Sequence, residues 1–485
     1  MKDAAYLGLD LGGTGAKAGL FNAEGSLLGL GQARFEPQIS PAGHAEIAID
    51  EIYLAARQAV RQALASSGAR VLALAISSQG QTFVALDEDD RPLHPAIMWY
   101  DSRAAEQAAQ LQAAAAHFSG AVPEPSAIAT ASKILWLRAQ RPELMRRARR
   151  YLLLPDYFAY RLSGEAVTDP NTAATTALYT ADGFGYHAGL LEAVGLELAQ
   201  LARVLPCGSP VAPVRPELAA EWGLAPETLL VTGTNDQYAG ALGAGNCRPG
   251  ILSETSGTCL AMVTLTEQRL EPVPRGLFTG RFPIAAYYYL LAYSKTAGVV
   301  LDWFRKNFAP TASLEDLTQA AAGVPIGAHG VSMLPTFDGA ISPRPNQALR
   351  GVFANLSLQH TSADLFRAIL EALSFALHEN ILHLSANGFA PEVIRSIGGG
   401  ARNDFWLQMK ADVTGLTVEK PAVTEAAVLG AAMLAASGQG AYRSLAEASA
   451  ALYRPSRLFN PDPERHGAYQ EAYQRYQKLR CRWPD

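Results

Sequence analysis

The chain has 485 residues, of which 49% are apolar and 18% charged, and its formal net charge is -5. This length suits two domains of about 240 residues each, and the composition is that of a globular protein. The weak negative charge offers no basic surface for nucleic acid, the four cysteines lack zinc-ligand spacing, and no apolar run is long enough to span a bilayer. We therefore expect a cytoplasmic protein without nucleic-acid or membrane partners.

The first segment, "YLGLDLGGTGAKAGLFN" (Tyr6 to Asn22), is rich in glycine and contains Asp10. Two known glycine loops fit it in part: the dinucleotide fingerprint at Gly13 to Ala18, and a P-loop before Lys17. Both loops require a helix after the glycines. Turn residues and a second apolar run from Leu27 follow instead, which is typical of a β-hairpin. We expect the glycines in the bend between two antiparallel strands, with Asp10 at its mouth.

The next segments alternate between helices and strands. A helix is expected from about residue 49 to 66, and a buried strand over "VLALAIS" (71–77). Alanine-rich residues 104–118 predict a surface helix, because alanine is the best helix former. A further helix begins near Pro155 and ends at Gly164.

Two clusters of polar and aromatic residues follow strands. They are "SSQGQTF" (77–83) and "MWYDSR" (98–103). Substrate contacts in an open α/β sheet usually lie after strands. The substrate contacts that we predict from these clusters are Gln79, Gly80, Gln81, Trp99 and Asp101.

The middle of the chain repeats the opening pattern. In "ILSETSGTCLAMVTL" (251–265), strand residues flank a bend of hydroxyl residues and glycine. Two such hairpins predict a duplicated domain, with domains at residues 1–245 and 246–485. Glycine N–H groups and a threonine hydroxyl form a cradle for phosphate oxygens, so two facing hairpins would clamp a polyphosphate. Asp10 would then hold Mg²⁺, which needs only one or two carboxylates when it binds phosphates.

Asp236 lies in "GTNDQYAG", where a glycine turn leads into small residues that can form a helix. One interpretation is an N-cap aspartate, a common use. The other is a general base that accepts a proton from a substrate hydroxyl, while metal and phosphate loops supply electrostatic stabilisation. The two interpretations are compatible.

The second half of the chain contains three further elements with clear boundaries. A long amphipathic helix is expected over residues 362–386. A strand, a glycine turn at 398–400 and a helix from about Asn403 follow. The segment "VTEAAVLGAAMLAASGQG" predicts a closely packed helix that is capped by Thr424 and ends at Gly438.

As a set, these motifs resemble those of the FGGY family of carbohydrate kinases. The resemblance rests on "GLDLGGTGAKAGLFN", "GTNDQYAG", "SETSGT", "GGGARNDFWLQMKAD" and "TEAAVLGAAMLAA", in this order, and extends over essentially the whole chain. It implies two α/β domains of the actin-like, ribonuclease H-like fold, with ATP in the cleft between them and a sugar deeper inside.

The resemblance also implies the cofactors ATP and Mg²⁺ and a role for individual residues. Asp236 would be the general base and, with Asp10, a metal ligand. The implied ATP-binding residues are Gly12, Gly13, Thr14 and Lys17 in the first hairpin, Gly257 and Thr258 in the second, and Gly399, Gly400 and Asn403 at the adenosine.

Within the family, the layout is most similar to that of xylulokinases. Where those carry Ser-Gly-Gln-Met-His-Gly, this chain has Ser77 to Thr82, so Gln81 stands at the position of the sugar-contacting histidine. The Arg-Glu pair of glycerol kinases is also missing, and the xylulokinase segment Ser-Gly-Glu-Arg-Thr-Pro is replaced by "FDGAISPRP" (337–345). Glutamine can donate and accept hydrogen bonds to a polyol, as neutral histidine can. We expect phosphorylation of the terminal hydroxyl of a ketopentose, with D-xylulose giving D-xylulose 5-phosphate as the leading reaction.

Several alternatives are weighed against this reaction. The acceptor can be another ketose, an alditol such as erythritol, or gluconate. A different class is a non-catalytic, chaperone-like ATP-binding regulator of the actin fold, which would need a peptide-binding domain where this sequence ends in one expected helix. A Rossmann dehydrogenase is disfavoured because a strand follows the glycine loop. The oligomeric state also stays open, with a homodimer as one option.

Overall fold

The computed structural model describes residues 4–118, 125–180 and 185–482. The chain forms two compact units. Unit 1 comprises residues 1–245, 280–286 and 426–452, and unit 2 comprises residues 246–279, 287–425 and 453–485. Residues 426–452, which the sequence analysis placed in the second domain, therefore pack in the first unit.

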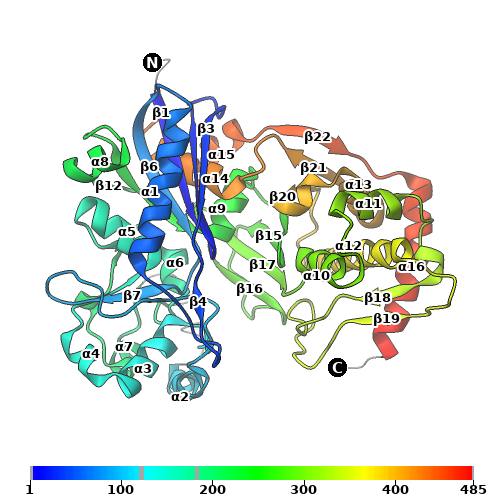
Figure 1. Cartoon of the computed structure of the whole chain (residues 1–485), viewed down its shortest axis with the longest axis horizontal. Coiled ribbons are helices and arrows are strands. Elements are labelled where there is room, and N and C mark those ends of the chain that lie inside the picture. The colour runs from blue at the N-terminus through cyan, green and yellow to red at the C-terminus, as the bar shows by residue number, and fades with distance from the viewer. Residues whose placement is uncertain (1–3, 119–124, 181–184, 483–485) are drawn as a thin grey trace. The chain divides into compact units, whose positions relative to one another are not determined.

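Unit 1 is built on a six-stranded sheet and a smaller five-stranded sheet (Figure 1). The strands up to residue 245 are β1 (Ala4–Leu11), β2 (Gly15–Phe21), β3 (Leu27–Arg34), β4 (Gln38–Ile39), β5 (Ala45–Ile47), β6 (Arg70–Ser78), β7 (Phe83–Leu86), β8 (Ala96–Ile97), β9 (Arg150–Leu153), β10 (Val167–Thr168), β11 (Arg203–Val204), β12 (Pro210–Pro213) and β13 (Leu229–Asn235). The α-helices of this unit are α1 (Ile49–Ala65), α2 (Ala105–Ala115), α3 (Thr130–Gln140), α4 (Pro142–Arg147), α5 (Leu154–Ser163), α6 (Pro170–Ala174), α7 (Ala188–Val194), α8 (Pro216–Trp222), α9 (Asp236–Gly243), α14 (Ala426–Gly438) and α15 (Leu445–Leu452).

Unit 2 is built on a seven-stranded sheet with a separate two-stranded ribbon. The strands after residue 245 are β14 (Ile251–Ser256), β15 (Leu260–Thr266), β16 (Leu277–Arg281), β17 (Tyr288–Ser294), β18 (Ser332–Leu334), β19 (Val352–Ala354), β20 (Val393–Ile397), β21 (Thr417–Pro421) and β22 (Pro455–Phe459). The α-helices of this unit are α10 (Gly298–Phe308), α11 (Leu314–Ala322), α12 (Ser362–Ala386), α13 (Asp404–Thr414) and α16 (Pro463–Arg482).

The two large sheets share one pattern of strand pairing. In unit 1 the order β3-β2-β1-β6-β13 has two antiparallel pairs followed by two parallel pairs. In unit 2 the order β17-β15-β14-β20-β21 has the same directions in the same sequence. Each expected glycine hairpin, β1-β2 and β14-β15, therefore lies at the centre of its sheet, as a duplicated domain requires.

Glycines on the central sheet of unit 1 let two helices approach opposite faces. A Cβ on Gly8 would overlap the backbone of α14, and one on Gly31 would overlap the backbone of α1. Successive side chains of a strand point to opposite faces, and the register places Gly31 of β3 on the face opposite to Gly8. The apolar face of α1, which Ile52, Ala56 and other residues form, is thus buried against β2 and β3.

The helix α14 packs on β1, β6, β13 and α9 of unit 1. Its contact with α9 is close because both helices present glycine, Gly243 on α9 and Gly430 on α14, and a Cβ on either would overlap a carbonyl oxygen of the other helix. This packing explains why residues 426–452 join unit 1. The small residues of α14 predicted that this helix packs closely, but they did not predict that it packs against α9.

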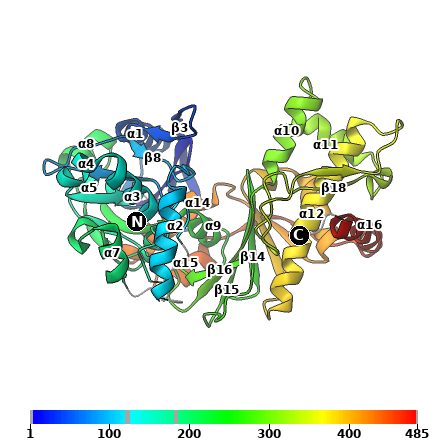
Figure 2. The same cartoon turned by 90° about the horizontal axis from the view of Figure 1, so that it is seen from below.

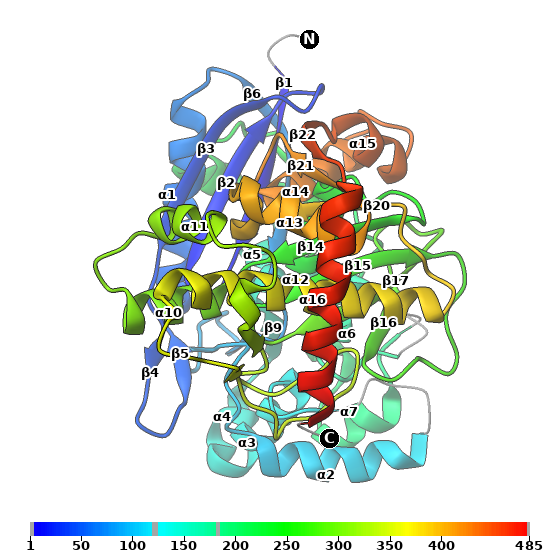
Figure 3. The same cartoon turned by 90° about the vertical axis from the view of Figure 1, so that its right-hand side faces the viewer.

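In unit 2, α12 is buried on almost all sides, rather than along one amphipathic stripe as expected. Its buried residues include the charged Arg367 and Glu371, which form an ion pair with 2.7 Å between Nε and Oε1. The helix packs against α11, α13, α16 and β18 (Figures 2 and 3). Neighbours on several sides leave no exposed stripe.

Most predicted element boundaries agree with the structure. The helices at 49–66, 155–164 and 362–386 and the strand at 71–77 are present within a few residues, as α1, α5, α12 and β6. The last three residues of the predicted terminal helix lie outside the described residues. Among the described helices, none has a long enough apolar stretch to cross a membrane.

Candidate active site

Three strands of unit 1 bring Asp10, Ser77 and Asn235 to one edge of the sheet. The register pairs Asp10 on β1 with Ser77 on β6, and pairs Thr234 and Asn235 on β13 with Ser77 and Ser78. Because these strands are parallel, their carboxyl ends meet at the same edge. The Ser77 hydroxyl donates a hydrogen bond of 2.9 Å to Asp10 Oδ1, which orients this carboxylate.

Asp236 is the first residue of α9 and follows β13 directly. The N-cap is Asn235, whose side chain accepts from the N–H of Gln237 at 3.1 Å, so the interpretation of Asp236 as the N-cap is wrong. Burial and then the negative charge of Asp10 raise the pKa of Asp236 to about 7, although the side chain is partly exposed. A carboxylate that titrates near neutral pH suits a general base.

The bend of the first hairpin, residues 12–14, is open to a ligand. Gly12 and Gly13 are half-buried and Thr14 is exposed. The N–H of Gly12 donates to the carbonyl of Gly15 at 3.0 Å, which closes the bend. Lys17 lies on β2 directly opposite Asp10. The predicted phosphate and metal residues of this hairpin thus lie at the same edge as Asp236.

The bend of the second hairpin, residues 257–259, lies in unit 2 beside the glycine turn at 398–400. A Cβ on Gly400 would lie 2.6 Å from the Ser256 Cβ, and one on Gly398 would lie 3.2 Å from Thr255 Cγ2, so both positions favour glycine. The carbonyls of Gly257 and Thr258 accept hydrogen bonds from the chain at Gly298 and Ala297, at 2.7 and 2.9 Å. The structure therefore brings the second predicted phosphate bend and the predicted adenosine turn together.

Asn403 has a structural role beside this turn. Its side-chain oxygen caps α13 by accepting from the N–H of Trp406 at 3.0 Å. Its side-chain nitrogen donates to Thr318 Oγ1 at 3.1 Å. The oxygen and the nitrogen of the Asn403 amide thus both have hydrogen-bond partners within unit 2. The neighbouring Gly399 is exposed.

Gln79 is the clearest candidate for a substrate contact in unit 1. Its side chain is 4% exposed, and among the described residues neither its amide nitrogen nor its amide oxygen has a hydrogen-bond partner. A Cβ on Gly13 would lie 3.4 Å from Gln79 Oε1 and 3.4 Å from Trp99 Nε1. Buried polar groups are nearly always paired, so this unpaired amide between the first bend and an indole indicates a site for a polar ligand.

The backbone around Gly80 and Gln81 is fixed by Thr175. A Cβ on Gly80 would lie 2.6 Å from Thr175 Cγ2, so no larger residue fits. Gln81 has a left-handed φ of 58°, its N–H donates to Thr175 Oγ1 at 3.2 Å, and its side chain is half-buried. Backbone interactions therefore fix Gln81, which stands where a histidine was expected. The side chain of Gln81 remains accessible.

Asp101 is not available to a sugar, which corrects the sequence prediction. It is fully buried, and Oδ1 accepts from the backbone N–H and Nε of Arg103 at 3.0 and 2.9 Å. Oδ2 accepts from Arg103 Nη2 and from the N–H of Ala45, both at 2.6 Å. These four bonds use the acceptor sites that a carboxylate offers. Asp101 holds the loop that carries Trp99.

Two buried lysines were missed in the sequence analysis. Lys133 on α3 binds backbone carbonyls beside Gln81 and Trp99, and burial lowers its pKa to about 7 although Asp101 opposes this shift. Lys410 on α13 donates to both carboxylate oxygens of Glu254, at 3.0 and 2.9 Å, beneath the second bend. Lys133 is followed by the apolar run "ILWL", and this is the signal that would have indicated a buried charge, whereas Lys410 lies between Gln408 and Asp412 and has no such signal.

Asp10 and Asp236 are two carboxylates whose charges interact. The negative charge of Asp10 raises the pKa of Asp236. A bound cation removes this repulsion, and Mg²⁺ takes one or two carboxylates when it also binds phosphates. The edge thus brings together two carboxylates, an open glycine bend and, in Asp236, a side chain whose pKa lies near neutral pH, and groups of these kinds take part in phosphoryl transfer.

Comparison with known proteins agrees with this arrangement. Residues 5–243 match the N-terminal domain model of the FGGY family of carbohydrate kinases, and residues 253–438 match its C-terminal domain model. The chain belongs to the FGGY family. The predicted family and enzyme class, a carbohydrate kinase, are confirmed.

Individual relatives cover nearly the whole chain. A xylulose kinase from Bacillus subtilis is 28% identical over 98% of this chain and 96% of its own length. An autoinducer-2 kinase from Salmonella typhimurium is 29% identical over 98% of this chain and 93% of its own. A crystal structure described as a xyloylose kinase from Brucella ovis has a TM-score of 0.89 at 26% identity and covers 98% of both chains. The predicted pair of actin-like α/β domains is thereby confirmed.

Proposed function

We propose that this FGGY kinase transfers the γ-phosphoryl group of ATP to the terminal hydroxyl of a ketopentose, with D-xylulose as the leading substrate. The observation that carries the proposal is the buried, unpaired amide of Gln79 between Gly13 and Trp99. A polyol hydroxyl can both donate to and accept from such an amide. The similarity to xylulose kinases over nearly the full length supports the choice of sugar.

In the proposed reaction Asp236 accepts the proton of the attacking hydroxyl. Its pKa of about 7 lets it take this proton near neutral pH. The backbone N–H groups of Gly13 and Thr14 in the first bend and of Thr258 in the second bind phosphate oxygens and stabilise developing negative charge. The N–H groups of Gly12 and Gly257 close these bends by donating to the carbonyls of Gly15 and Cys259. Gly399 and Gly400, with Asn403 as the cap of α13, hold the adenosine. Asp10 and Asp236 would hold Mg²⁺, which would supply positive charge to neutralise the phosphates.

A panel of acceptors assayed with MgATP tests the proposal. The panel contains D-xylulose, other ketoses, erythritol, glycerol, gluconate and autoinducer-2. We expect the highest kcat/KM for D-xylulose and no measurable turnover for the Asp236→Asn variant, which controls for contaminating kinases. Absence of activity with D-xylulose would end the leading version of the proposal.

Autoinducer-2 or gluconate is the second candidate for the acceptor. The autoinducer-2 kinase is as similar to this chain as the xylulose kinases are. Gln81 also replaces the histidine expected in xylulokinases. The Gln81→His variant tests this position: a rise in the ratio of D-xylulose activity to activity with the other acceptors would assign sugar preference to residue 81, and an unchanged ratio would exclude it.

A further inference from the structure

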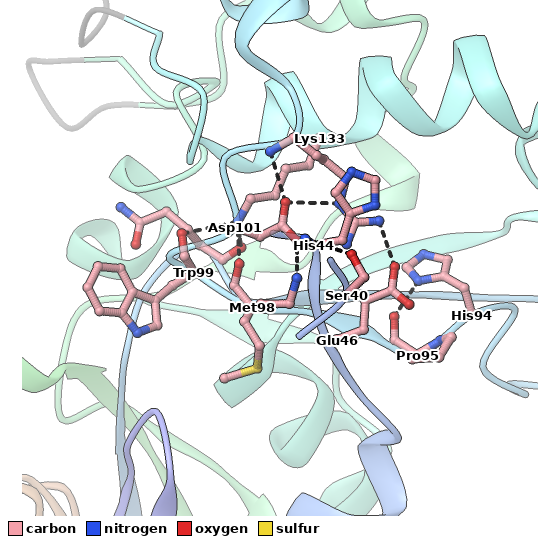
Figure 4. Close-up of polar contacts among 12 residues, drawn as sticks. Ser40, His44, Glu46, His94, Pro95, Met98, Trp99, Asp101 and Lys133 are labelled. Atoms are coloured by element: carbon pink, nitrogen blue, oxygen red, sulfur yellow. Dashed lines mark hydrogen bonds and ion pairs between the residues drawn. The ribbon is translucent and has the colours of Figure 1, made fainter. Parts of the chain in front are cut away.

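The ammonium group of Lys133 lies in a cage of backbone carbonyls in unit 1. Lys133 is on α3 and its side chain is fully buried. Nζ donates to the carbonyl oxygens of Met98 at 2.7 Å and Trp99 at 3.3 Å (Figure 4). It also donates to the carbonyl oxygen of Gln81 at 3.4 Å. In its protonated form a lysine has three N–H donors, one for each of these carbonyl acceptors.

These carbonyls belong to two separate segments of the candidate sugar site. Gln81 lies in the connection between β6 and β7, and Met98 and Trp99 lie in the loop after β8. The side chains of Gln81 and Trp99 are predicted substrate contacts, one on each segment. Lys133 is therefore a link between the two segments, although its own side chain is not accessible to a ligand.

A neighbouring residue of α3 strengthens the link. Thr130 Oγ1 donates to the carbonyl of Gln81 at 3.3 Å. Thr130 lies one turn before Lys133, and residues three apart lie on the same face of a helix. One face of α3 thus fixes the backbone at Gln81 through two donors.

The Trp99 loop is fixed from its other side by an ionic cluster. Arg103 holds the buried Asp101 through two side-chain bonds, and its Nη1 donates to Glu46 Oε1 at 2.6 Å. Asp101 also accepts from the backbone N–H of Ala45. Lys133 joins the loop that is held there to the segment of Gln81.

We propose that Lys133 is a positioning residue that sets the distance between Gln81 and Trp99 and so determines which sugars the site accepts. This inference rests on the proposed function, because it assigns both side chains to the sugar. Without the ammonium group, three buried carbonyls each lose one donor. Those of Gln81 and Met98 keep a second donor, Thr130 Oγ1 and the N–H of Asp101, whereas the Trp99 carbonyl loses its bond to Lys133 and its segment must shift to pair it again. A shift of about 1 Å at a reacting site can cost on the order of 100-fold in rate.

The first test replaces Lys133 by methionine, which keeps the length of the side chain but removes its donors. We expect the KM for the best acceptor of the panel to rise on the order of 10-fold or more, and the KM for ATP to stay within about twofold. The ratio of activities between acceptors is expected to change as well. Equal changes in both KM values, with an unchanged acceptor ratio, would overturn the proposal.

Arg138→Met is the matched control. Arg138 lies on the same helix and also donates to a backbone carbonyl, that of Val194, at 3.0 Å. The substitution again replaces a cation by methionine, but at a site away from Gln81 and Trp99. We expect sugar KM and acceptor ratio to match those of the unmodified enzyme; a change equal to that of Lys133→Met would show a general effect of α3 and overturn the proposal.

A double-mutant cycle with Gln81→Ala tests whether Lys133 acts through Gln81. If it does, Lys133→Met raises the sugar KM less in the Gln81→Ala background than in the unmodified enzyme. Equal effects in both backgrounds would contradict positioning of Gln81. Thr130→Val, which removes only the second donor to Gln81, is expected to act in the same direction with a smaller change in sugar KM, and it provides a milder variant if Lys133→Met fails to fold.

Hydrogen exchange without any sugar separates this inference from the proposed function. In Lys133→Met or Thr130→Val we expect faster exchange in residues 79–83, with unchanged exchange in the hairpin at 11–15. The Lys133 variant should also show faster exchange in residues 98–103. This outcome would support positioning even if no acceptor of the panel were phosphorylated, and unchanged exchange in 79–83 would overturn it even if D-xylulose proved to be the substrate.

Discussion

Asp236 illustrates how a single residue gains its chemistry from its neighbours. It begins α9 without capping it, because Asn235 accepts the hydrogen bond from Gln237. Its side chain stays partly exposed at the edge of the sheet that also carries Asp10. Burial and the charge of Asp10 raise its pKa to about 7, from an ordinary value of 3.8. The same burial and neighbouring charge that raise this pKa mean that the ionised form of Asp236 lowers the stability of the folded protein.

Asp236→Asn should abolish turnover and stabilise the protein. Between pH 4 and 7 the unfolded chain has lost this proton while the folded protein keeps it, so the stability of the unmodified enzyme falls as pH rises through this window. The advantage of the asparagine variant should grow over the same window, by at most about 1.4 kcal/mol per pH unit, and stay constant above it. Solvent at the partly exposed carboxyl reduces this limit.

Thermal unfolding of both proteins from pH 4 to 8, without Mg²⁺ or ATP, measures this difference. The kcat/KM of the unmodified enzyme should in parallel fall about tenfold per pH unit below pH 7, because the carboxylate form becomes rarer. A variant that retains turnover, or a stability difference that does not depend on pH, would show that Asp236 is not the base.

At the scale of elements, the contact between α9 and α14 controls the position of Asp236. The helices approach closely only because Gly243 and Gly430 have no Cβ, and α9 carries Asp236 at its first position. A larger residue in such a close contact can be accommodated only if the backbone of one helix moves. Helix α14 therefore supports the candidate base although it lies far from it in sequence.

Gly430→Ala should destabilise the protein and reduce turnover. The added Cβ would overlap the carbonyl of Ala239, and such overpacking typically costs about 1–3 kcal/mol. The control is Gly467→Ala on α16, where a Cβ meets nothing within 4 Å. The control should gain about 0.5–1 kcal/mol, because alanine is the better helix residue. Denaturant unfolding and kcat of both variants test this, and equal stabilities would contradict the close packing.

At the scale of the whole molecule, unit 1 is not a continuous stretch of chain. Its sheet is covered on one face by α14, whose residues 426–438 follow most of unit 2 in sequence. A fragment that ends at residue 245 leaves this face uncovered. The apolar side chains that this face would then expose favour aggregation.

We therefore expect residues 1–245 to be insoluble when expressed alone. The same fragment with residues 426–452 attached through a flexible linker should be more soluble, because α14 and α15 can cover the sheet again. Size-exclusion chromatography and circular dichroism measure both proteins. A monomeric fragment 1–245 that unfolds cooperatively would show that α14 is dispensable for this unit.

Local patterns in the sequence predicted much of the fold. The two glycine hairpins, the long helix at 362–386 and the glycine turn before α13 follow from turn residues, periodicity and caps, which act over a few neighbouring residues. The same patterns brought Asp10, Asp236 and Gln79 forward as candidates. The family models then confirmed the resemblance of these motifs to FGGY kinases.

Other features could not be predicted from local patterns because they depend on residues that are distant in sequence. Asp101 was predicted as a sugar contact, but Ala45 and Arg103 occupy its oxygens. Lys133 was overlooked because its partners, Gln81 and Trp99, come from two other segments. No local pattern reports which carbonyls a buried ammonium will meet.

The sequence by itself therefore determined the family, the duplicated hairpins and the residue types that phosphoryl transfer needs. Only the tertiary structure decided which of these residues have unpaired groups for a ligand, as Gln79 does, and which are used by the fold, as Asp101 is. The physical reason is that hydrogen-bond capacity is finite. Whether a polar side chain is free for substrate depends on every segment that packs around it.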